Sequence, residues 1–367
     1  MEDEKVSDSP VANATFFNVS SLQTYRALFA QGAFFTMKPI IIGAILGIGI
    51  IGIIGNILTV TVFKRLGFSQ TIHINYVALA VSDMCSILHI MWCSICYSPI
   101  IELFFSRFRI ATDPDVFLNF TGIWPYHAFS KLTALLTAWI STERCLYVVF
   151  PIKAKLIITP FVTKLVLTAI FTFGGAPAVF AFMGCTVEWR FDRVQNQTRL
   201  FMFENNLNTF HPLSQIAFTL YGAVHPVLSG VNTVVSTTFL VIKLRKSATW
   251  RKRMLNAPTN EITGRGNFRQ NTMSTSTIHV TKSVVTIACV FIVCSLLMSL
   301  TVLLAAFTRE YFLYGKLRYL FLLNSFIALL LSEINSSVNI LIFTIMGSRF
   351  RSELIHMFRR GGENTRM

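Results

Sequence analysis

Seven long apolar runs constrain the fold of this chain more than any other feature. Each run is long enough to cross a hydrocarbon core of about 30 Å, which takes roughly 20 residues of helix. The runs cover residues 39–63, 73–97, 120–150, 161–184, 216–244, 280–307 and 317–346. Only 13% of the 367 residues are charged, about half the usual share near 25%, and the mean hydropathy is +0.59. The sequence therefore predicts an all-α membrane protein built as a seven-helix bundle.

Lysine and arginine residues are concentrated on one side of the predicted membrane. They fall in alternate connections and in the tail, whereas the other connections mix acidic and basic residues. The basic set includes Lys64, Arg65, Lys153, Lys155, Lys243, Arg245, Lys246, Arg251, Lys252, Arg253, Arg265, Arg269, Arg349, Arg351, Arg359, Arg360 and Arg366. Cytoplasmic loops carry such an excess. We therefore expect a multi-pass protein of the plasma membrane with its N-terminus outside the cell and its C-terminus in the cytosol.

This topology divides the chain into three parts. Residues 1–38 form an extracellular segment, residues 39–346 form the bundle with a third cytoplasmic loop at 246–278, and residues 347–367 form an amphipathic helix and a short tail. Glycosylation sequons begin at Asn13, Asn18 and Asn196, all on the predicted outside. Because the net charge of +15 is explained by residues flanking the membrane helices, the lipid surface is the expected partner and nucleic acid is not.

Polar residues interrupt the last apolar run. Asn335, Ser336 and Asn339 share one face of a helix there, and Asp83 lies about halfway along the second run. Each unsatisfied polar group in lipid costs several kcal/mol, so we expect all four side chains to face the interior of the bundle. Together they predict an oxygen-rich polar pocket.

Four short motifs follow one another in a characteristic order. They are Gly55 with Asn56, LAVSD ending at Asp83, ERC beginning at Glu143, and NSSVNILIF from Asn335 to Phe343. This set resembles the rhodopsin-like (class A) G-protein-coupled receptors over about residues 39–358. The sequence departs from that family where Ile340 replaces a proline, where Phe343 replaces a tyrosine, and where no cysteine pair marks the usual extracellular disulfide. The sequence around the ERC motif is similar to the sequences of divergent, chemosensory-type receptors of invertebrates such as molluscs.

The resemblance implies a receptor that couples an external ligand to heterotrimeric G proteins, and no enzymatic activity. It implies an activation switch at Glu143, Arg144, Asn339 and Phe343. It also implies a sodium-type site, the one cofactor expected, formed by Asp83, Thr133, Asn335, Ser336 and Asn339. Carboxylate, hydroxyl and amide oxygens suit such a hard cation. The alternative at the same place is a hydrated polar network without an ion.

Ionisable and aromatic residues in the outer half of the bundle are candidates for ligand binding. The set is Tyr126, His127, Lys131, Tyr221, His225 and Glu333. Intramembrane charges mark functional sites by default, but two readings of Lys131 and Glu333 remain open. Either the two residues pair with each other, or they present opposite charges to a peptide or a small chemosensory molecule.

Two further expectations concern the cytoplasmic side. Ser274, Thr275, Ser276 and Thr277 in the third loop are candidates for phosphorylation, which would favour an arrestin-like partner. After the last span, apolar residues recur at helical spacing between arginines, as in a helix that lies on the membrane surface; they are Phe350, Leu354, Met357 and Phe358.

The alternative function is a multi-spanning transporter or channel. The buried charges of Asp83, Lys131 and Glu333 would also suit that function.

Overall fold

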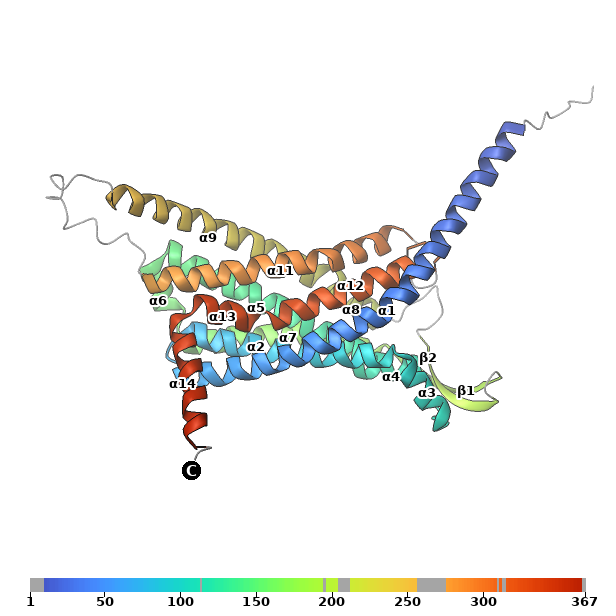
Figure 1. Ribbon diagram of the computed structural model, residues 1–367, viewed down its shortest axis with the longest axis horizontal. Coiled ribbons are helices and arrows are strands. Elements are labelled where there is room, and N and C mark those ends of the chain that lie inside the picture. The colour runs from blue at the N-terminus through green and yellow to red at the C-terminus, as the bar shows by residue number, and fades with distance from the viewer. Residues whose placement is uncertain are drawn as a thin grey trace, which may run out of the picture.

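The computed structural model describes residues 10–112, 114–193, 196–203, 212–255, 275–308, 310–311 and 315–364. Long helices run side by side along one axis of the molecule, with a β-hairpin at one end and a helix lying across the other end (Figure 1). In chain order the elements are α1 (Pro10–Leu66), α2 (Thr71–Cys96), α3 (Pro99–Arg107), α4 (Pro114–Leu118), η1 (Asn119–Ile123), α5 (Trp124–Val149), α6 (Pro151–Ile157), α7 (Pro160–Met183), β1 (Thr186–Asp192), β2 (Gln197–Phe203), α8 (Pro212–Thr219), η2 (Leu220–Val224), α9 (His225–Leu255), α11 (Thr275–Phe307), α12 (Arg318–Ser337), α13 (Asn339–Met346) and α14 (Ser348–Asn364). We refer below to the hairpin end and the α14 end of the bundle.

Six helical segments are long and apolar enough to cross a membrane. They are Leu28–Leu66, Thr71–Cys96, Pro160–Met183, Pro212–Lys246, Ile278–Ala305 and Arg318–Met346. The seventh span is α5, which is less apolar because it carries Lys131, Glu143 and Arg144. It packs against α2, α7, α9 and α11, and a helix surrounded by other helices has no need of an apolar surface on every side. The predicted seven-helix fold is confirmed.

Helices run past two of the predicted boundaries. Helix α1 continues well before residue 39, because residues 28–38 remain largely apolar and Phe34 packs against Tyr319 and Phe326 of α12, with ring centroids 5.8 and 5.9 Å away. The boundary predicted at residue 38 therefore lies inside this helix. The predicted third loop, 246–278, likewise contains helical residues at both of its ends, because α9 extends to Leu255 and α11 begins at Thr275; residues 256–274 lie outside the described part of the chain.

An aromatic cluster attaches α14 to the α14 end of the bundle. Phe350 is buried, and its ring lies 5.2 Å from Phe63 of α1 and 5.7 Å from Phe343 of α13. Glu353 adds an ion pair with Arg65 at 3.7 Å. Phe358, two turns further along α14, is 62% exposed. Because the helix lies across the bundle (Figure 1), the exposed side chain is placed as expected for an amphipathic helix at a membrane surface.

The hairpin of β1 and β2 was not predicted from the sequence. The strands pair antiparallel from Thr186 opposite Phe203 to Asp192 opposite Gln197. Leu200 donates its backbone N–H to the carbonyl of Ala111 at 2.9 Å. Arg199 ion-pairs with Asp192 at 3.2 Å. The connection between α3 and α4 therefore anchors the hairpin to the rest of the molecule.

Candidate functional site

A polar network at Asp83 joins three helices in the middle of the bundle. Asp83 is fully buried. Its Oδ1 accepts a hydrogen bond from the Thr133 hydroxyl of α5 at 2.9 Å, and its Oδ2 accepts one from the Asn339 amide of α13 at 2.7 Å. Thr133 lies 3.1 Å from the hydroxyl of Ser82. A buried carboxylate needs such partners, and the structure provides them from helices far apart in the sequence.

The break between α12 and α13 places the remaining polar residues of this region. Helix α12 ends at Ser337 and α13 begins at Asn339, although isoleucine stands where the resembling family has a proline. Asn56 of α1 reaches into the break and donates from Nδ2 to the carbonyls of Gly52 at 2.9 Å and Ser336 at 3.0 Å. The Ser336 side chain lies beside the Asp83 carboxylate.

Four of the five residues predicted for the sodium-type site therefore come together. They are Asp83, Thr133, Ser336 and Asn339. Asn335, the fifth, lines the neighbouring cavity instead. The oxygens of Asp83, Thr133 and Ser336 are the kind of ligand that a hard cation takes. Asn339 presents its NH₂ group to Asp83, so its carbonyl oxygen would have to turn toward an ion.

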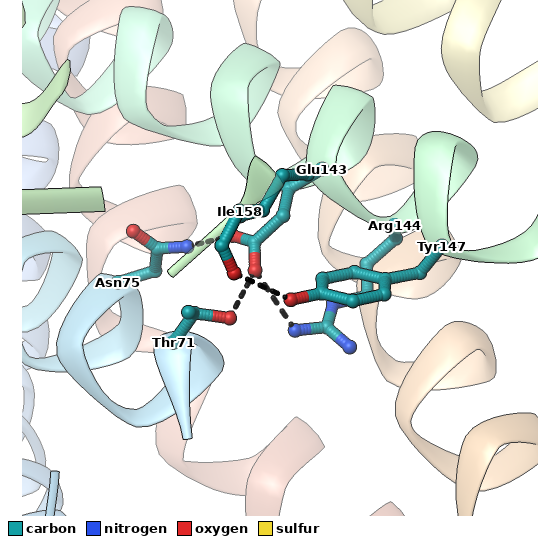
Figure 2. A network of polar contacts seen from close by, with 6 residues as sticks. All are labelled: Thr71, Asn75, Glu143, Arg144, Tyr147 and Ile158. Atoms are coloured by element: carbon teal, nitrogen blue, oxygen red, sulfur yellow. Dashed lines mark hydrogen bonds and ion pairs between the residues drawn. The ribbon is translucent and has the colours of Figure 1, made fainter. Parts of the chain in front are cut away.

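A second polar centre holds Arg144 at the α14 end (Figure 2). Glu143 is fully buried, and its carboxylate lies 3.3 Å from a terminal nitrogen of Arg144. The same carboxylate accepts hydrogen bonds from Thr71 and Asn75 of α2. The Arg144 guanidinium also stacks over the ring of Tyr147 at 5.0 Å, an attraction between a cation and an aromatic face.

Sequence reasoning missed Thr71 and Asn75. The available signal was their spacing of four residues, which places both side chains on one face of a helix. What the spacing alone could not show is that this face meets the last turns of α5. Phe343, the fourth member of the predicted switch, is buried against Tyr76 with ring centroids 4.5 Å apart.

A cavity of about 960 Å³ opens among α5, α9, α11 and α12. Three of the predicted ligand-binding residues line it: Tyr126, Lys131 and Tyr221. Lys131 is the one fully charged side chain among the described residues of its wall. Thr133, Asn335 and Ser336 line the same cavity. A single space therefore connects Lys131 with the polar network at Asp83.

The other three predicted residues do not line this cavity. His225 is fully buried, with its ring 4.5 Å from Phe173 of α7. His127 packs between the rings of Tyr126 and Tyr221, at 5.2 and 6.2 Å. Both histidines therefore support the wall from behind.

Glu333 faces α1 and α2, away from Lys131. It is fully buried, and a side chain in place of Gly49 would collide with its carboxylate and with Met91. Within the described part of the chain, neither carboxylate oxygen has a hydrogen-bond partner and no ion pair joins Glu333 to Lys131. Of the two readings left open for these residues, the structure shows no pairing, and Glu333 does not line the cavity of Lys131 either, because the rotation of α12 turns Glu333 toward Gly49 of α1.

The predicted glycosylation residues differ in what the structure shows of them. Asn196 is exposed in the turn between β1 and β2, with a φ of 51°. Asn13 and Asn18 belong to the first turns of α1, but their side chains lie outside the described part of the chain.

Comparison with known proteins covers nearly all of the bundle. Residues 44–361 match the family described as Serpentine type 7TM GPCR chemoreceptor Srw. The match extends from α1 to α14, so it includes every residue of the two polar centres and of the cavity. It gives no support to the narrower likeness to mollusc receptors. No curated protein matches the chain.

Proposed function

Because this chain belongs to the Srw family of serpentine seven-transmembrane chemoreceptors, we propose that its central cavity binds a small chemosensory ligand and that Arg144 transmits the signal. Membership of a G-protein-coupled receptor family implies coupling to a G protein. The observation that carries the proposal is the continuity of one cavity from Lys131 to Thr133, Asn335 and Ser336. A ligand in that cavity reaches the wall of the Asp83 network directly.

The wall of the cavity suggests the chemistry of the ligand. A volume of about 960 Å³ lies at the upper end of the range of small-molecule sites, which favours a small molecule over an extended peptide. Apolar side chains of α9 and α11 make up most of the wall, and Lys131 supplies the single charge among its described residues. We infer a ligand with an apolar body and an anionic or strongly accepting group that meets the Lys131 ammonium.

The cavity is also open to the side between α9 and α11. Val227 and Val231 of α9 and Leu303 of α11 line it, and each is more than half exposed. An apolar ligand dissolved in the membrane would therefore have a route into the site. This opening agrees with the apolar body inferred for the ligand.

Signal transfer would proceed through the two polar centres. A ligand can shift a two-state equilibrium only if it binds one state better, and contacts to α5 and α12 would do this by moving Thr133 and Ser336. In the resting state Glu143 restrains Arg144 at 3.3 Å. Release would free a planar, multi-donor guanidinium for the backbone carbonyls of a G-protein helix entering at the α14 end. Asn339, in the Asp83 network, and Phe343, one turn further along α13 against Tyr76, would complete the switch.

We further propose a sodium ion at Asp83 in the resting receptor. Asp83, Thr133 and Ser336 would hold it, with Asn339 after rotation of its amide. An ion there would add positive charge beside a buried carboxylate and so favour the resting arrangement. The hydrated network without an ion remains the alternative at the same residues.

For orientation, we propose that the hairpin end faces outward and the α14 end faces the cytosol. The support is that Lys64 and Arg65 at the end of α1, Lys153 and Lys155 of α6, and the arginines of α14 all belong to the α14 end. An arrestin-like partner is proposed for the same side. Thr275, Ser276 and Thr277 form the first turn of α11, where added phosphate would be stabilised by the helix N-terminus; Ser274 lies outside the described residues.

A ligand screen on two receptor variants tests the proposal. Cells expressing the full chain with G-protein activation sensors would be challenged with a panel of small apolar carboxylates and their neutral amides. We expect active carboxylates to lose at least about tenfold in potency on Lys131→Met, since about 1.4 kcal/mol corresponds to tenfold. The matched control is Lys164→Met, on the exposed face of α7. Equal potency on the parent and on Lys131→Met would contradict the cavity as the ligand site.

A further inference from the structure

A second cavity lies at the hairpin end, apart from the one that contains Lys131. We call it the rim cavity. It has a volume of about 390 Å³, and its walls are mainly Trp92, Ile101, Phe104, Phe105, Ile110 and Phe117. The indole N–H of Trp92 is already bonded to the Thr121 hydroxyl at 2.8 Å. Such walls offer apolar contact and almost no hydrogen bonding, so the matching ligand is an apolar chain.

The turn at the end of α3 forms part of the wall of this cavity. Helix α3 ends in a turn in which the Ile110 N–H bonds to the Phe105 carbonyl at 3.0 Å and the Arg109 N–H bonds to the Ser106 carbonyl at 3.3 Å. These two bonds form the Schellman motif, in which the residue after the turn packs against the last turn of the helix. The motif brings Ile110 back beside Phe105, and both line the cavity.

Exposed apolar side chains lie next to the rim cavity in the sequences of α2 and α3. Trp92 lies one turn before the end of α2, where membrane helices commonly carry interfacial aromatic residues. Leu88, four residues deeper on the same face, is 49% exposed. On α3, Ile100 and Leu103 are 71% and 69% exposed. These side chains would give acyl chains of the bilayer an apolar route to the cavity along α2 and α3.

Two arginines lie where α3 ends beside the cavity. Arg107 and Arg109 are both exposed. Arg109 has a φ of 47°, in the left-handed region where a residue with a Cβ is disfavoured and where glycine is the usual choice at this point of the motif. The turn therefore does not explain arginine at this position. Guanidinium groups bind phosphate through paired hydrogen bonds.

We propose that the rim cavity binds an acyl chain of one phospholipid from the leaflet at the hairpin end, with the lipid phosphate on Arg107 and Arg109. The site would also brace the hairpin, because Thr112 lines the cavity and its carbonyl accepts a hydrogen bond from Arg199 of β2 at 2.9 Å. Lipid binding here would act on the hairpin independently of the ligand in the central cavity, since no described residue lines both.

Photo-crosslinking in a defined bilayer tests this site. The full chain would be reconstituted in phosphatidylcholine nanodiscs that contain a phosphatidylglycerol with a diazirine in its acyl chain, and adducts would be located by peptide mass spectrometry. We expect adducts concentrated in residues 92–117. Ile101→Trp, which fills the cavity, should remove them, whereas Leu103→Trp, on the exposed face of the same helix, should not. Adducts spread evenly to lipid-facing residues such as Leu165 of α7, unchanged by Ile101→Trp, would show ordinary surrounding lipid and overturn the proposal.

The phosphate contact has its own test. Arg107→Gln with Arg109→Gly keeps the turn, because glycine suits the left-handed backbone, and removes both charges. Adducts from the phosphatidylglycerol probe should fall by about tenfold, while those from a diazirine fatty alcohol should not change. Arg193→Gln, in the hairpin turn, is the matched control, and equal thermal unfolding curves would show that each variant is folded. If adducts from both probes fell, or adducts from neither probe fell, the assignment of Arg107 and Arg109 to the phosphate would be contradicted.

Discussion

At the scale of single residues, Glu143 has the strongest predicted effect on signalling. Its buried carboxylate receives hydrogen bonds from Thr71 and Asn75 and an ion pair from Arg144. Glu143→Gln keeps the shape and removes the charge. A hydrogen bond to a charged group contributes about 1.5–3 kcal/mol, so we expect ligand-independent G-protein activation to rise by roughly tenfold or more. A G-protein activation sensor, normalised to receptor at the cell surface, measures this.

Glu353→Gln is the control for that experiment. Glu353 also pairs with an arginine at the α14 end, but at 3.7 Å and with both side chains partly exposed. Such surface pairs contribute about 0–1 kcal/mol, so basal activity should not change. Unchanged basal activity of Glu143→Gln at equal surface expression would remove the restraint assigned to Glu143.

Asp83 gives a second prediction at the residue scale. If Asp83 holds sodium, replacing potassium by sodium should raise the melting temperature of the purified parent receptor, and Asp83→Asn should abolish that increase, because only the carboxylate carries charge to meet the cation. Asp192→Asn in the hairpin should leave it intact. A parent receptor with the same melting temperature in both salts would leave the hydrated network as the correct description.

At the scale of the elements, three glycines determine how closely α1 approaches its neighbours. Gly49, Gly52 and Gly55 are spaced three residues apart on the side of α1 that meets its neighbours, and small residues at an interface let membrane helices pack closely. A Cβ at Gly55 would lie 2.8 Å from Ile340 of α13. The same face brings Asn56 to the break between α12 and α13.

Enlarging one of these glycines should therefore destabilise the bundle. We expect Gly55→Leu to cost about 1–3 kcal/mol through overpacking and to lower the melting temperature in detergent. Gly47→Leu is the matched control, because nothing lies within 4 Å of a Cβ built there and leucine suits a lipid-facing surface. Equal melting of the two variants would show that α1 does not depend on this close contact.

At the scale of the whole molecule, the orientation across the membrane can be tested at the hairpin. Asn196 is exposed in its turn, and we propose that this end faces the outside of the cell. Expression in glycosylating cells should give a band that glycosidase shifts, with a smaller shift in Asn196→Gln. Thr198→Val destroys the same sequon without changing Asn196 and should behave identically.

The opposite orientation makes a different prediction for the same experiment. If the hairpin end faced the cytosol, neither substitution would change the glycosidase shift, and a tag after residue 367 would be accessible to protease on intact cells. Either result would reverse the proposed sides of the ligand cavity and of Arg144.

The sequence by itself determined the number of spans and the identity of most residues in the two polar centres. Length and apolarity of a membrane helix are local properties, because the helix satisfies its own backbone hydrogen bonds within lipid. The same reasoning placed Asp83, Ser336 and Asn339 inside the bundle, where the structure has them. The third span is less apolar than the other spans, and the helices that surround it explain its buried charges.

Only the tertiary structure decided which neighbour each side chain meets. Glu333 and Lys131 lie in the same half of the bundle by sequence, yet Glu333 faces Gly49 of α1 while Lys131 lines the central cavity. Thr71 and Asn75 likewise gain their role from contact with Glu143. The rim cavity exists because the chain turns back after α3. The rotation of one helix against another depends on packing between segments far apart in the chain, and no local pattern of residues contains that information.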